Sequence, residues 1–174
     1  MNSLIVLFQR IRLVVMDMDG VLTDGKLMLF DNSNWVRKMD IKDGYSIQYA
    51  IKKGVKIAVV SGSFSDAIKM RMARLGVDSF YENIKDKGVK IEEIANLHGL
   101  SKEEILYIGD DIPDLSAFNA VGTTACPADA VPEIKERADY ISRNTGGNGC
   151  VRDVLEKVLR VKGLWNTDAH ISSI

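Results

Sequence analysis

Four short runs of consecutive apolar residues recur along the chain, and they constrain its fold more than any other feature. The runs are RLVVM (12–16), VKIAVV (55–60), EILYI (104–108) and GTTA (122–125). Continuous rather than alternating apolarity is typical of strands that are buried on both faces, as in a parallel sheet.

The segments between and after these runs have the periodicity and end signals of amphipathic helices. SDAIKMRMARLG, for example, begins with Ser-Asp and ends with Gly, as capped helices do. The expected helices are 44–54, 65–76, 87–99, 132–138 and 151–161. The alternation predicts one doubly wound, Rossmann-like α/β domain over residues 1–174, with a parallel sheet and helices on both of its faces.

One insertion interrupts the alternation. Residues 26–39 predict a β-hairpin, with KLMLF and WVRKM as strands around a polar turn. Between Ser61 and Lys87 there is room only for a helix and a short strand, so we expect no inserted cap domain. The tail 163–174 has no clear period.

The hairpin also carries a prediction about assembly. An isolated hairpin is marginal in water, and exposed apolar side chains of this kind mark an interface. We therefore expect a homo-oligomer in which the hairpins pack together; the alternative is a hairpin that folds back on its own domain. The apolar residues concerned are Leu27, Met28, Leu29, Phe30 and Trp35.

Composition excludes several other classes of protein. The chain is 46% apolar and 27% charged with a net charge of −1, and it has no basic block, so we expect no nucleic-acid partner. The only apolar run near the N-terminus, 4–8, is too short for a membrane span and has no basic residue before it, as a signal peptide would. Two cysteines do not make a disulfide framework. A cytoplasmic location away from membranes is the expectation.

Polar residues follow three of the apolar runs, at the point where each predicted strand ends. In open parallel sheets ligands bind at the carboxyl ends of the strands, so one face would gather these side chains. They are Asp17 and Asp19 after the first run, Ser61 after the second, Asp110, Asp111 and Asp114 after the third, and Lys87 at a helix start.

The residue types indicate phosphate chemistry. Clustered aspartates favour Mg²⁺, a hydroxyl beside backbone N–H groups forms an anion pocket, and a lysine neutralises phosphate charge. In the pair Asp17-Met-Asp19, one carboxylate can attack phosphorus while the other exchanges a proton with the leaving oxygen. Asp110 is the stronger metal-ligand candidate, and Asp114 is a candidate brace behind it.

Each of these residues also has a simpler interpretation. Ser61 alone would be a helix cap and Lys87 a surface lysine, while Asp111 and Asp114 would be acidic residues at a helix N-terminus. The glycines in GGNG (146–149) would form a turn that caps the last helix, and they do not have the spacing of a dinucleotide-binding loop.

Through these residues the chain resembles the haloacid dehalogenase superfamily. All four motifs are present in order: Asp17-Met-Asp19-Gly20, Ser61-Gly62, Lys87 and Gly109-Asp110-Asp111-x-x-Asp114. The resemblance extends to the capless phosphatases of 3-deoxy-D-manno-octulosonate 8-phosphate (KDO 8-phosphate). It covers roughly residues 11 to 160, through DGVLTDG, DGYSI, RMARLGV, YIGDD and GGNGCVRDV.

The resemblance implies a Mg²⁺-dependent phosphatase that acts through an aspartyl-phosphate. Asp17, Asp19, Ser61 and Lys87 would be catalytic, and Asp17, Asp110 and the backbone carbonyl of Asp19 would hold the metal. The related enzymes are tetramers, which implies a homotetramer whose neighbouring subunits wall each site.

The substrate is a phosphorylated sugar acid in this interpretation. Ser63 departs from the family, because KDO 8-phosphate enzymes usually have Arg there and relatives acting on nine-carbon ulosonic acid 9-phosphates have Glu. Either sugar therefore stays open. Candidate substrate-binding residues are Asp24, Gly62, Ser63, Arg71 and Arg152, the two arginines as partners for a carboxylate.

Two other functions use similar residues. A phospho-accepting receiver domain is also doubly wound, but its lysine follows a late strand, whereas Lys87 precedes the GDD motif. A phosphomutase needs an enclosure that keeps water from the phospho-enzyme. Hydrolysis is favoured because the chain has no cap.

Overall fold

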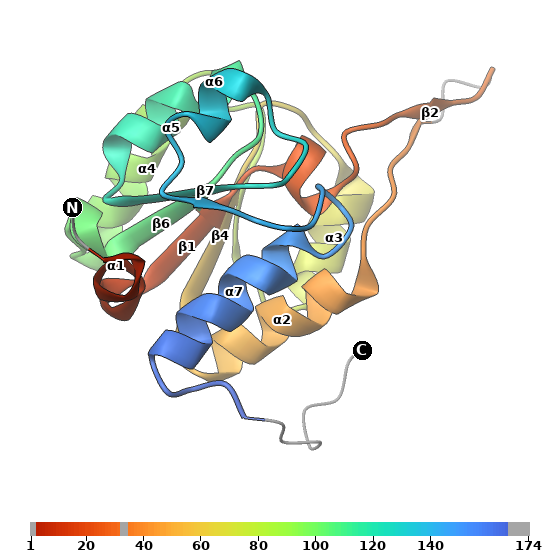
Figure 1. Cartoon of the computed structure of the whole chain (residues 1–174). Helices are drawn as coiled ribbons and strands as arrows, with labels where there is room; N and C mark the ends of the chain where they lie inside the picture. Colours follow the sequence, from red (N-terminus) through yellow and green to blue (C-terminus); the bar gives the residue numbers. More distant parts are fainter. Residues whose placement is uncertain (1–2, 32–34, 167–174) are drawn as a thin grey trace.

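The computed structural model describes residues 3–31 and 35–166 of the 174-residue chain. Six parallel strands form a twisted sheet in the order β5-β4-β1-β6-β7-β8 (Figure 1). The strands are β1 (Leu13–Met16), β4 (Lys56–Val60), β5 (Ser79–Tyr81), β6 (Ile105–Ile108), β7 (Thr123–Cys126) and β8 (Tyr140–Ile141). The four apolar runs form β1, β4, β6 and β7, which confirms the predicted parallel sheet.

Helices cover both faces of this sheet, as predicted for a doubly wound fold (Figure 1). One face carries α1 (Leu4–Arg10), α2 (Ile41–Lys52), α3 (Asp66–Arg74) and α7 (Cys150–Val161). The other carries α4 (Lys87–His98), α5 (Leu115–Ala120) and α6 (Pro132–Lys135). Within the described residues, no helix is both long and apolar enough to cross a bilayer.

Helix α1 is an element that the sequence did not predict. Ser3 caps it by accepting a hydrogen bond from the backbone N–H of Ile5 at 3.3 Å. Phe8 is buried, while Ile5 stays exposed. The apolar segment 4–8 is thus a short helix packed against α7.

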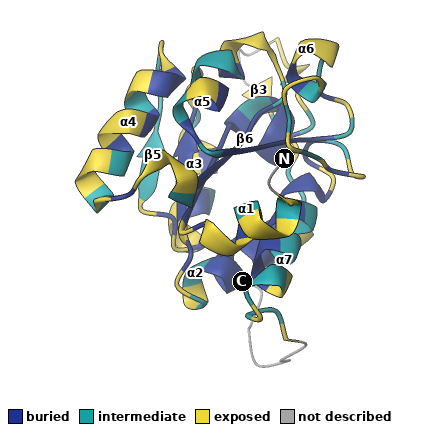
Figure 2. Cartoon of the chain, turned by 60° about the vertical axis from the view of Figure 1, so that its left-hand side comes forward, coloured by how far each residue is buried: buried dark blue, intermediate teal, exposed yellow. Residues whose placement is uncertain are grey.

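Alternation along the central strand divides the core into two layers. Val14 and Met16 pack toward α2 and α7, whereas Leu13 and Val15 pack toward α4 and α5. Figure 2 shows the buried inner surfaces of the helices and their exposed outer surfaces. Because both faces of β1 are covered, all four of its residues are buried, which explains its unbroken apolar run.

The predicted hairpin projects from the body of the domain (Figure 1). Its strands, β2 (Met28–Leu29) and β3 (Trp35–Val36), are antiparallel and shorter than the sequence suggested. Their side chains are between 50% and 66% exposed, so the hairpin does not fold back on its own domain. Part of its turn, 32–34, lies outside the described residues, as does 167–174 of the predicted tail.

Candidate active site

The ends of three neighbouring strands form one cavity. Strands β4, β1 and β6 lie side by side and parallel, so the residues that follow them reach the same edge of the sheet. The cavity there has a volume of about 340 Å³. Predicted site residues that line it are Asp17, Asp19, Ser61, Gly62, Ser63, Lys87, Asp110, Asp111 and Asp114.

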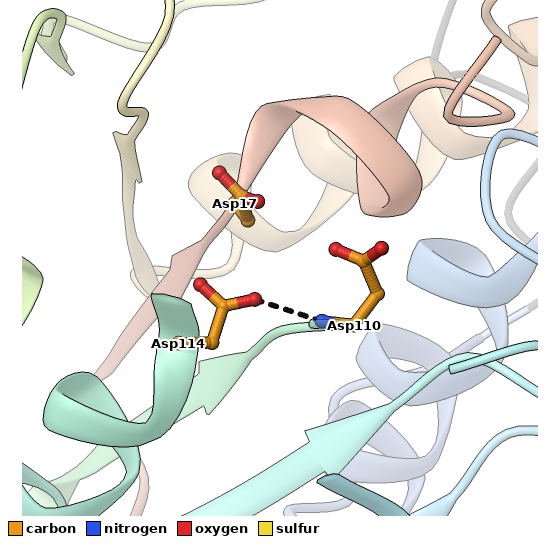
Figure 3. A group of neighbouring side chains, drawn as sticks. All are labelled: Asp17, Asp110 and Asp114. Carbon is orange, nitrogen blue, oxygen red and sulfur yellow. Dashed lines mark hydrogen bonds between the residues drawn. The ribbon is translucent and has the colours of Figure 1, made fainter. Parts of the chain in front are cut away.

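Three carboxylates converge at the base of this cavity. Asp17, Asp110 and Asp114 each place an oxygen within 4.8 Å of the others, as Figure 3 shows. Burial and then the charge of Asp114 raise the pKa of Asp17 to about 6, against the opposing effect of Lys87. Burial and then the charges of Asp17 and Asp114 raise the pKa of Asp110 to about 8.

This cluster fits a divalent cation. Oδ1 of Asp110 is buried and has no hydrogen-bond partner among the described residues. An orphaned buried carboxylate oxygen is costly, and a bound cation would remove the cost. Hard oxygen donors with this charge suit Mg²⁺.

A glycine makes room for Asp110. Gly20 has a φ of +90°, and a Cβ at this position would lie 2.0 Å from Oδ2 of Asp110. Any other residue would displace the carboxylate from the cluster. The turn η1 (Met18–Leu22) can therefore lie directly against the end of β6.

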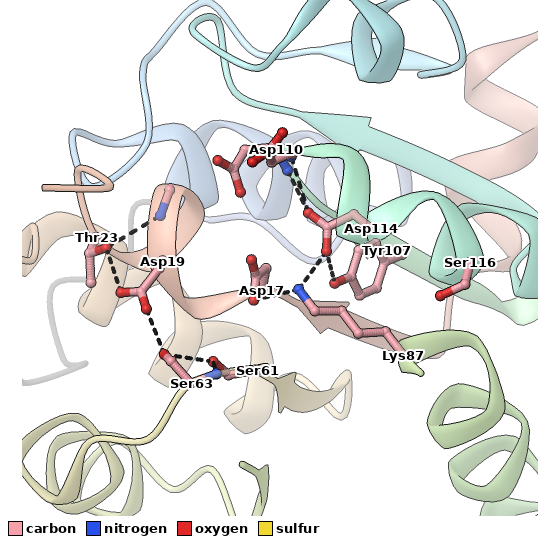
Figure 4. Close-up of polar contacts among 12 residues, drawn as sticks. Asp17, Asp19, Thr23, Ser61, Ser63, Lys87, Tyr107, Asp110, Asp114 and Ser116 are labelled. Atoms are coloured by element: carbon pink, nitrogen blue, oxygen red, sulfur yellow. Dashed lines mark hydrogen bonds and ion pairs between the residues drawn. The ribbon is translucent and has the colours of Figure 1, made fainter. Parts of the chain in front are cut away.

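Lys87 holds the cluster together from the start of α4. Its Nζ lies 2.8 Å from Oδ1 of Asp17 and 2.6 Å from Oδ1 of Asp114 (Figure 4). Burial lowers the pKa of Lys87, but the charges of Asp17 and Asp114 outweigh it and the pKa is raised. Its side chain is only 6% exposed, so the surface-lysine interpretation is wrong.

Both carboxylate oxygens of Asp114 are occupied by partners from its own chain. Its Oδ1 also accepts a hydrogen bond from the hydroxyl of Tyr107 at 2.6 Å. Its Oδ2 accepts from the backbone N–H groups of Asp110 at 2.9 Å and Asp111 at 3.3 Å. Asp17 and Asp110 are thus left to face a cation, with Asp114 placed behind them. Asp111 caps the helical turn η3 (Ile112–Asp114), as its simpler interpretation proposed.

The hydroxyls after β4 connect to the second carboxylate of the first motif. Ser61 Oγ accepts from the backbone N–H of Ser63 at 3.1 Å, and Ser63 Oγ donates to Oδ2 of Asp19 at 2.6 Å. Ser65, not Ser61, caps α3, so the helix-cap interpretation of Ser61 is wrong. Asp19 also accepts two hydrogen bonds from Arg37, a residue that sequence reasoning missed.

The glycine segment 146–149 packs against the loop that carries Asp17 and Asp19. Gly147 donates its backbone N–H to the carbonyl of Val21 at 2.9 Å, and a Cβ on Gly146 would lie 1.8 Å from the carbonyl oxygen of Gly20. The segment also leads into α7, whose N-cap is Gly149, as the turn interpretation proposed.

A buried carboxylate on α2 holds the start of α7 in place. Asp43 accepts hydrogen bonds from the backbone N–H groups of Gly149 at 3.2 Å and Arg152 at 2.7 Å. Burial outweighs these hydrogen bonds and raises the pKa of Asp43 to about 6. Asp43 begins the motif DGYSI that carries the family resemblance, but no role was predicted for it from the sequence.

Three predicted substrate-binding residues are not among the described residues that line the cavity. Asp24 accepts from the backbone N–H of Lys26 at 3.1 Å. The guanidinium of Arg71 lies beside Gly44 of α2. That of Arg152 lies over the rings of Tyr45 and Trp165, in a separate polar depression on α7. Their contact with substrate stays a prediction.

Fold and site together define a class of hydrolases. A doubly wound sheet presents two aspartates after β1, a serine after β4, a lysine at the start of α4 and aspartates after β6. The family model of haloacid dehalogenase-like hydrolases matches residues 79–154, which include the lysine and the last aspartates.

Similar proteins identify the family within that class. The chain is 32% identical to the 3-deoxy-D-manno-octulosonate 8-phosphate phosphatase KdsC of Escherichia coli K12, over 89% of this chain and 82% of the relative. Against the Haemophilus influenzae enzyme of the same name the identity is 33%, over 89% and 86%. The chain belongs to this phosphatase family.

A solved structure agrees along nearly the whole chain. The structure of the 3-deoxy-D-manno-octulosonate 8-phosphate phosphatase from Moraxella catarrhalis, in complex with magnesium ion, phosphate ion and KDO, has a TM-score of 0.90. It is 29% identical, and the match covers 94% of each chain.

Proposed function

We propose that this protein hydrolyses KDO 8-phosphate to KDO and inorganic phosphate, with Mg²⁺ as cofactor. The observation that carries the proposal is the ion pair of Lys87 with Asp17, beside the unpartnered oxygen of Asp110. A lysine ammonium group, a candidate nucleophile and a candidate metal ligand thus lie in one cavity. The names and the bound ligands of the similar proteins support the choice of substrate.

Asp17 and Asp110 would hold the cation through their carboxylates, and Asp19 through its backbone carbonyl. When bound, Mg²⁺ supplies charge neutralisation for the phosphate oxygens. Lys87 supplies a second positive charge, and Ser61 and the backbone N–H groups after β4 supply hydrogen bonds. Together they would orient the phosphate with its phosphorus facing Asp17.

In the first step, a carboxylate oxygen of Asp17 attacks phosphorus. The bond between phosphorus and the sugar oxygen breaks, its electron pair stays on that oxygen, and Asp19 donates the proton that makes it a hydroxyl. Lys87 keeps Asp17 ionised and turned toward the phosphate. The products of this step are the free sugar and an aspartyl-phosphate.

In the second step, a water molecule attacks the aspartyl-phosphate. Asp19, now a carboxylate, accepts a proton from this water as the new bond to phosphorus forms. The bond between phosphorus and the Asp17 oxygen breaks, which releases inorganic phosphate and restores the Asp17 carboxylate. Asp19 is protonated again for the next turnover.

The identity of the sugar acid is the most specific part of the proposal. Ser63 has neither the Arg nor the Glu of the two known substrate types, so a nine-carbon ulosonic acid 9-phosphate is the alternative. Arg71 and Arg152 remain our candidates for the sugar carboxylate. Replacing the responsible arginine with alanine should raise KM for the acid-bearing substrate, and an unchanged KM in both variants contradicts this assignment.

Assembly into a homotetramer is part of the same proposal. The exposed apolar side chains of β2 and β3 support it, because contiguous exposed apolar patches mark interfaces. Light scattering of the full chain and of a variant lacking residues 27–36 tests it. A monomeric parent, or a deletion that leaves assembly intact, contradicts it. We also place the enzyme in the cytoplasm, in keeping with its two buried free thiols, Cys126 and Cys150.

The experiment that tests the function is phosphate release from a substrate panel. KDO 8-phosphate, nine-carbon ulosonic acid 9-phosphates and hexose phosphates would be compared, each with and without Mg²⁺. We expect the highest kcat/KM for KDO 8-phosphate and no turnover without the metal. A single modification of the protein without continuous phosphate release would instead support a receiver domain.

A further inference from the structure

Arg37 is turned toward the active site although it belongs to an exposed hairpin. It follows β3 directly, and the preceding residues Trp35 and Val36 are 61% and 50% exposed. The side chain of Arg37, by contrast, is only 10% exposed. A bridge between Thr23 and Met39 closes the base of the hairpin and fixes the backbone on either side of it.

The guanidinium forms a forked ion pair with Asp19. Nε of Arg37 lies 2.7 Å from Oδ1 of Asp19, and Nη2 lies 3.2 Å from Oδ2. A planar guanidinium bound in this way fixes both the position and the plane of a carboxylate. Nη2 is also 3.5 Å from Oγ of Ser63, which itself donates to Oδ2 of Asp19 at 2.6 Å.

Asp19 has little else to hold it in one orientation. Its remaining described partner is Thr23, whose hydroxyl donates to Oδ1 at 3.3 Å. The carboxylate is 35% exposed at the mouth of the cavity, unlike Asp17 at 12%. Because the carboxylate is partly exposed to solvent, the ion pair contributes little to stability, and the orientation of Asp19 is its larger effect.

We propose that Arg37 is a positioning residue that fixes the carboxylate of Asp19 in the orientation from which it exchanges a proton with the leaving oxygen. This inference rests on the proposed function, in which Asp19 is the general acid and base. Arg37 is not among the residues that line the cavity, so it would act through Asp19 rather than on the substrate. The hairpin would then contribute to catalysis as well as to assembly.

The dependence on leaving group separates this role from a merely structural one. A sugar alkoxide leaves poorly and needs a proton, whereas p-nitrophenolate leaves without one. For Arg37→Ala we expect kcat for KDO 8-phosphate to fall about 10- to 100-fold, a part of the roughly 10²–10⁴-fold that general acid–base catalysis supplies. With p-nitrophenyl phosphate, the rate of p-nitrophenolate release in the first turnover, before Asp19 acts on water, should stay within about threefold. KM should change little for either substrate.

Two further variants sharpen the test. Arg37→Lys keeps the charge but not the fork, so its kcat for KDO 8-phosphate should lie between those of the parent and Arg37→Ala. Lys38→Ala removes the same charge from the next residue of the hairpin, and it should behave as the parent does. Both are full-length chains assayed with Mg²⁺, and their assembly is checked by light scattering.

Three results would overturn the inference while the proposed function stands. Equal losses in the first turnover with both substrates would indicate a structural role, because only the sugar alkoxide needs the proton of Asp19. A rise in KM with KDO 8-phosphate but not with glucose 6-phosphate would assign Arg37 to binding of the sugar carboxylate. An Arg37→Ala enzyme that matches the parent would leave Asp19 positioned by Ser63 and Thr23 alone. A parent that releases phosphate from no sugar phosphate would overturn the proposed function itself, and this inference with it.

Discussion

The charged cluster and the hairpin lie at the same end of the sheet, but their side chains are covered in different ways. Asp17, Lys87 and Asp114 are between 1% and 8% exposed, and each has charged partners from its own chain. The apolar side chains of Leu29 and Trp35 are 66% and 61% exposed. One chain thus buries its charges and leaves apolar surface in water.

The difference shows which part of the enzyme is complete within one chain. A buried charge is tolerated when its partners are in place, and Lys87 pairs with two carboxylates from different loops. Burial of apolar surface stabilises a protein by about 25 cal/mol for each Å² removed from water, and this stabilisation is missing where the surface stays exposed. The cluster therefore forms with the fold, apart from its cation, whereas the hairpin has no cover among residues 3–31 and 35–166.

The largest effect should come from Asp17→Asn. An amide is a far weaker nucleophile and a poorer Mg²⁺ ligand, so turnover should fall on the order of 10⁴-fold or more. Phosphate release from KDO 8-phosphate measures it. The control is Asp78→Asn, an exposed carboxylate outside the cavity lining, which should leave turnover unchanged. Activity of the Asp17 variant within tenfold of the parent would refute the nucleophile assignment.

Lys87→Met should have the largest effect on stability. It leaves the carboxylates of Asp17 and Asp114 buried without their cation, which should cost about 3–5 kcal/mol of unfolding free energy. Denaturant titration without Mg²⁺ measures this loss, and Lys52→Met, at an exposed site on α2, is the control.

Adding Asp114→Asn to Lys87→Met should recover part of the stability without restoring activity. The double variant removes one of the uncompensated charges but not the need for a cation beside Asp17. A single variant that loses less than about 1 kcal/mol would mean that the cluster tolerates an unpaired charge.

Removal of the metal should give the protein a pH-dependent stability. Raised pKa values for Asp17, about 6, and Asp110, about 8, mean that the folded state binds protons more tightly than the unfolded state. On this account, stability without Mg²⁺ should therefore be greatest at or below about pH 4, the ordinary pKa of an aspartate, and fall as the pH rises toward 8. Thermal unfolding measures this change, because Tm shifts by about 2–4 °C for each kcal/mol of unfolding free energy.

Mg²⁺ should oppose the loss of stability at higher pH. The cation competes with protons for the carboxylates, so the rise in Tm on adding Mg²⁺ should be larger at pH 8 than at pH 6. Asp110→Asn should remove most of this rise and should itself stabilise the metal-free protein. A rise that is equal at both pH values would place the metal away from the cluster.

The smallest effect on folding should come from the hairpin. Replacing Leu29 and Trp35 with serine removes side chains that are already exposed, so the stability of a single subunit should change by no more than about 0.5 kcal/mol. Assembly should nevertheless be lost in light scattering. If the assembly survives, these side chains lie outside the interface, and the comparison between cluster and hairpin fails.

Much of the fold was predictable because its signals are local. Apolar runs fixed the positions of β1, β4, β6 and β7, and the parallel arrangement then brought Asp17, Ser61 and Asp110 to one edge. The short strand expected between Ser61 and Lys87 is β5, whereas the outer strand β8 has only two residues, too few to show a period. Tyr107 could have been found, because a tyrosine in a fully buried strand needs a partner for its hydroxyl.

Other site residues carried no signal in the sequence. Arg37 lies 18 residues from Asp19, in a hairpin whose strands are only two residues long, and nothing in its neighbours indicates an inward side chain. Arg152 stands in a motif of the family, yet its guanidinium lies over the rings of Tyr45 and Trp165, outside the cavity lining. Membership of a family motif favoured Arg152 over Arg37, although both are arginines.

The sequence by itself determined the alternation of the central strands with helices along the chain, the acidic motif after β1 and the family, because each depends on residues close together in the chain. Only the tertiary structure decided which charges meet: Lys87 with Asp17 and Asp114, and Arg37 with Asp19. These pairs join loops that the crossovers of the sheet bring together. Their geometry depends on strand order, on side-chain rotamers and on the close approach that Gly20 permits, none of which is encoded by the spacing of residues along the chain.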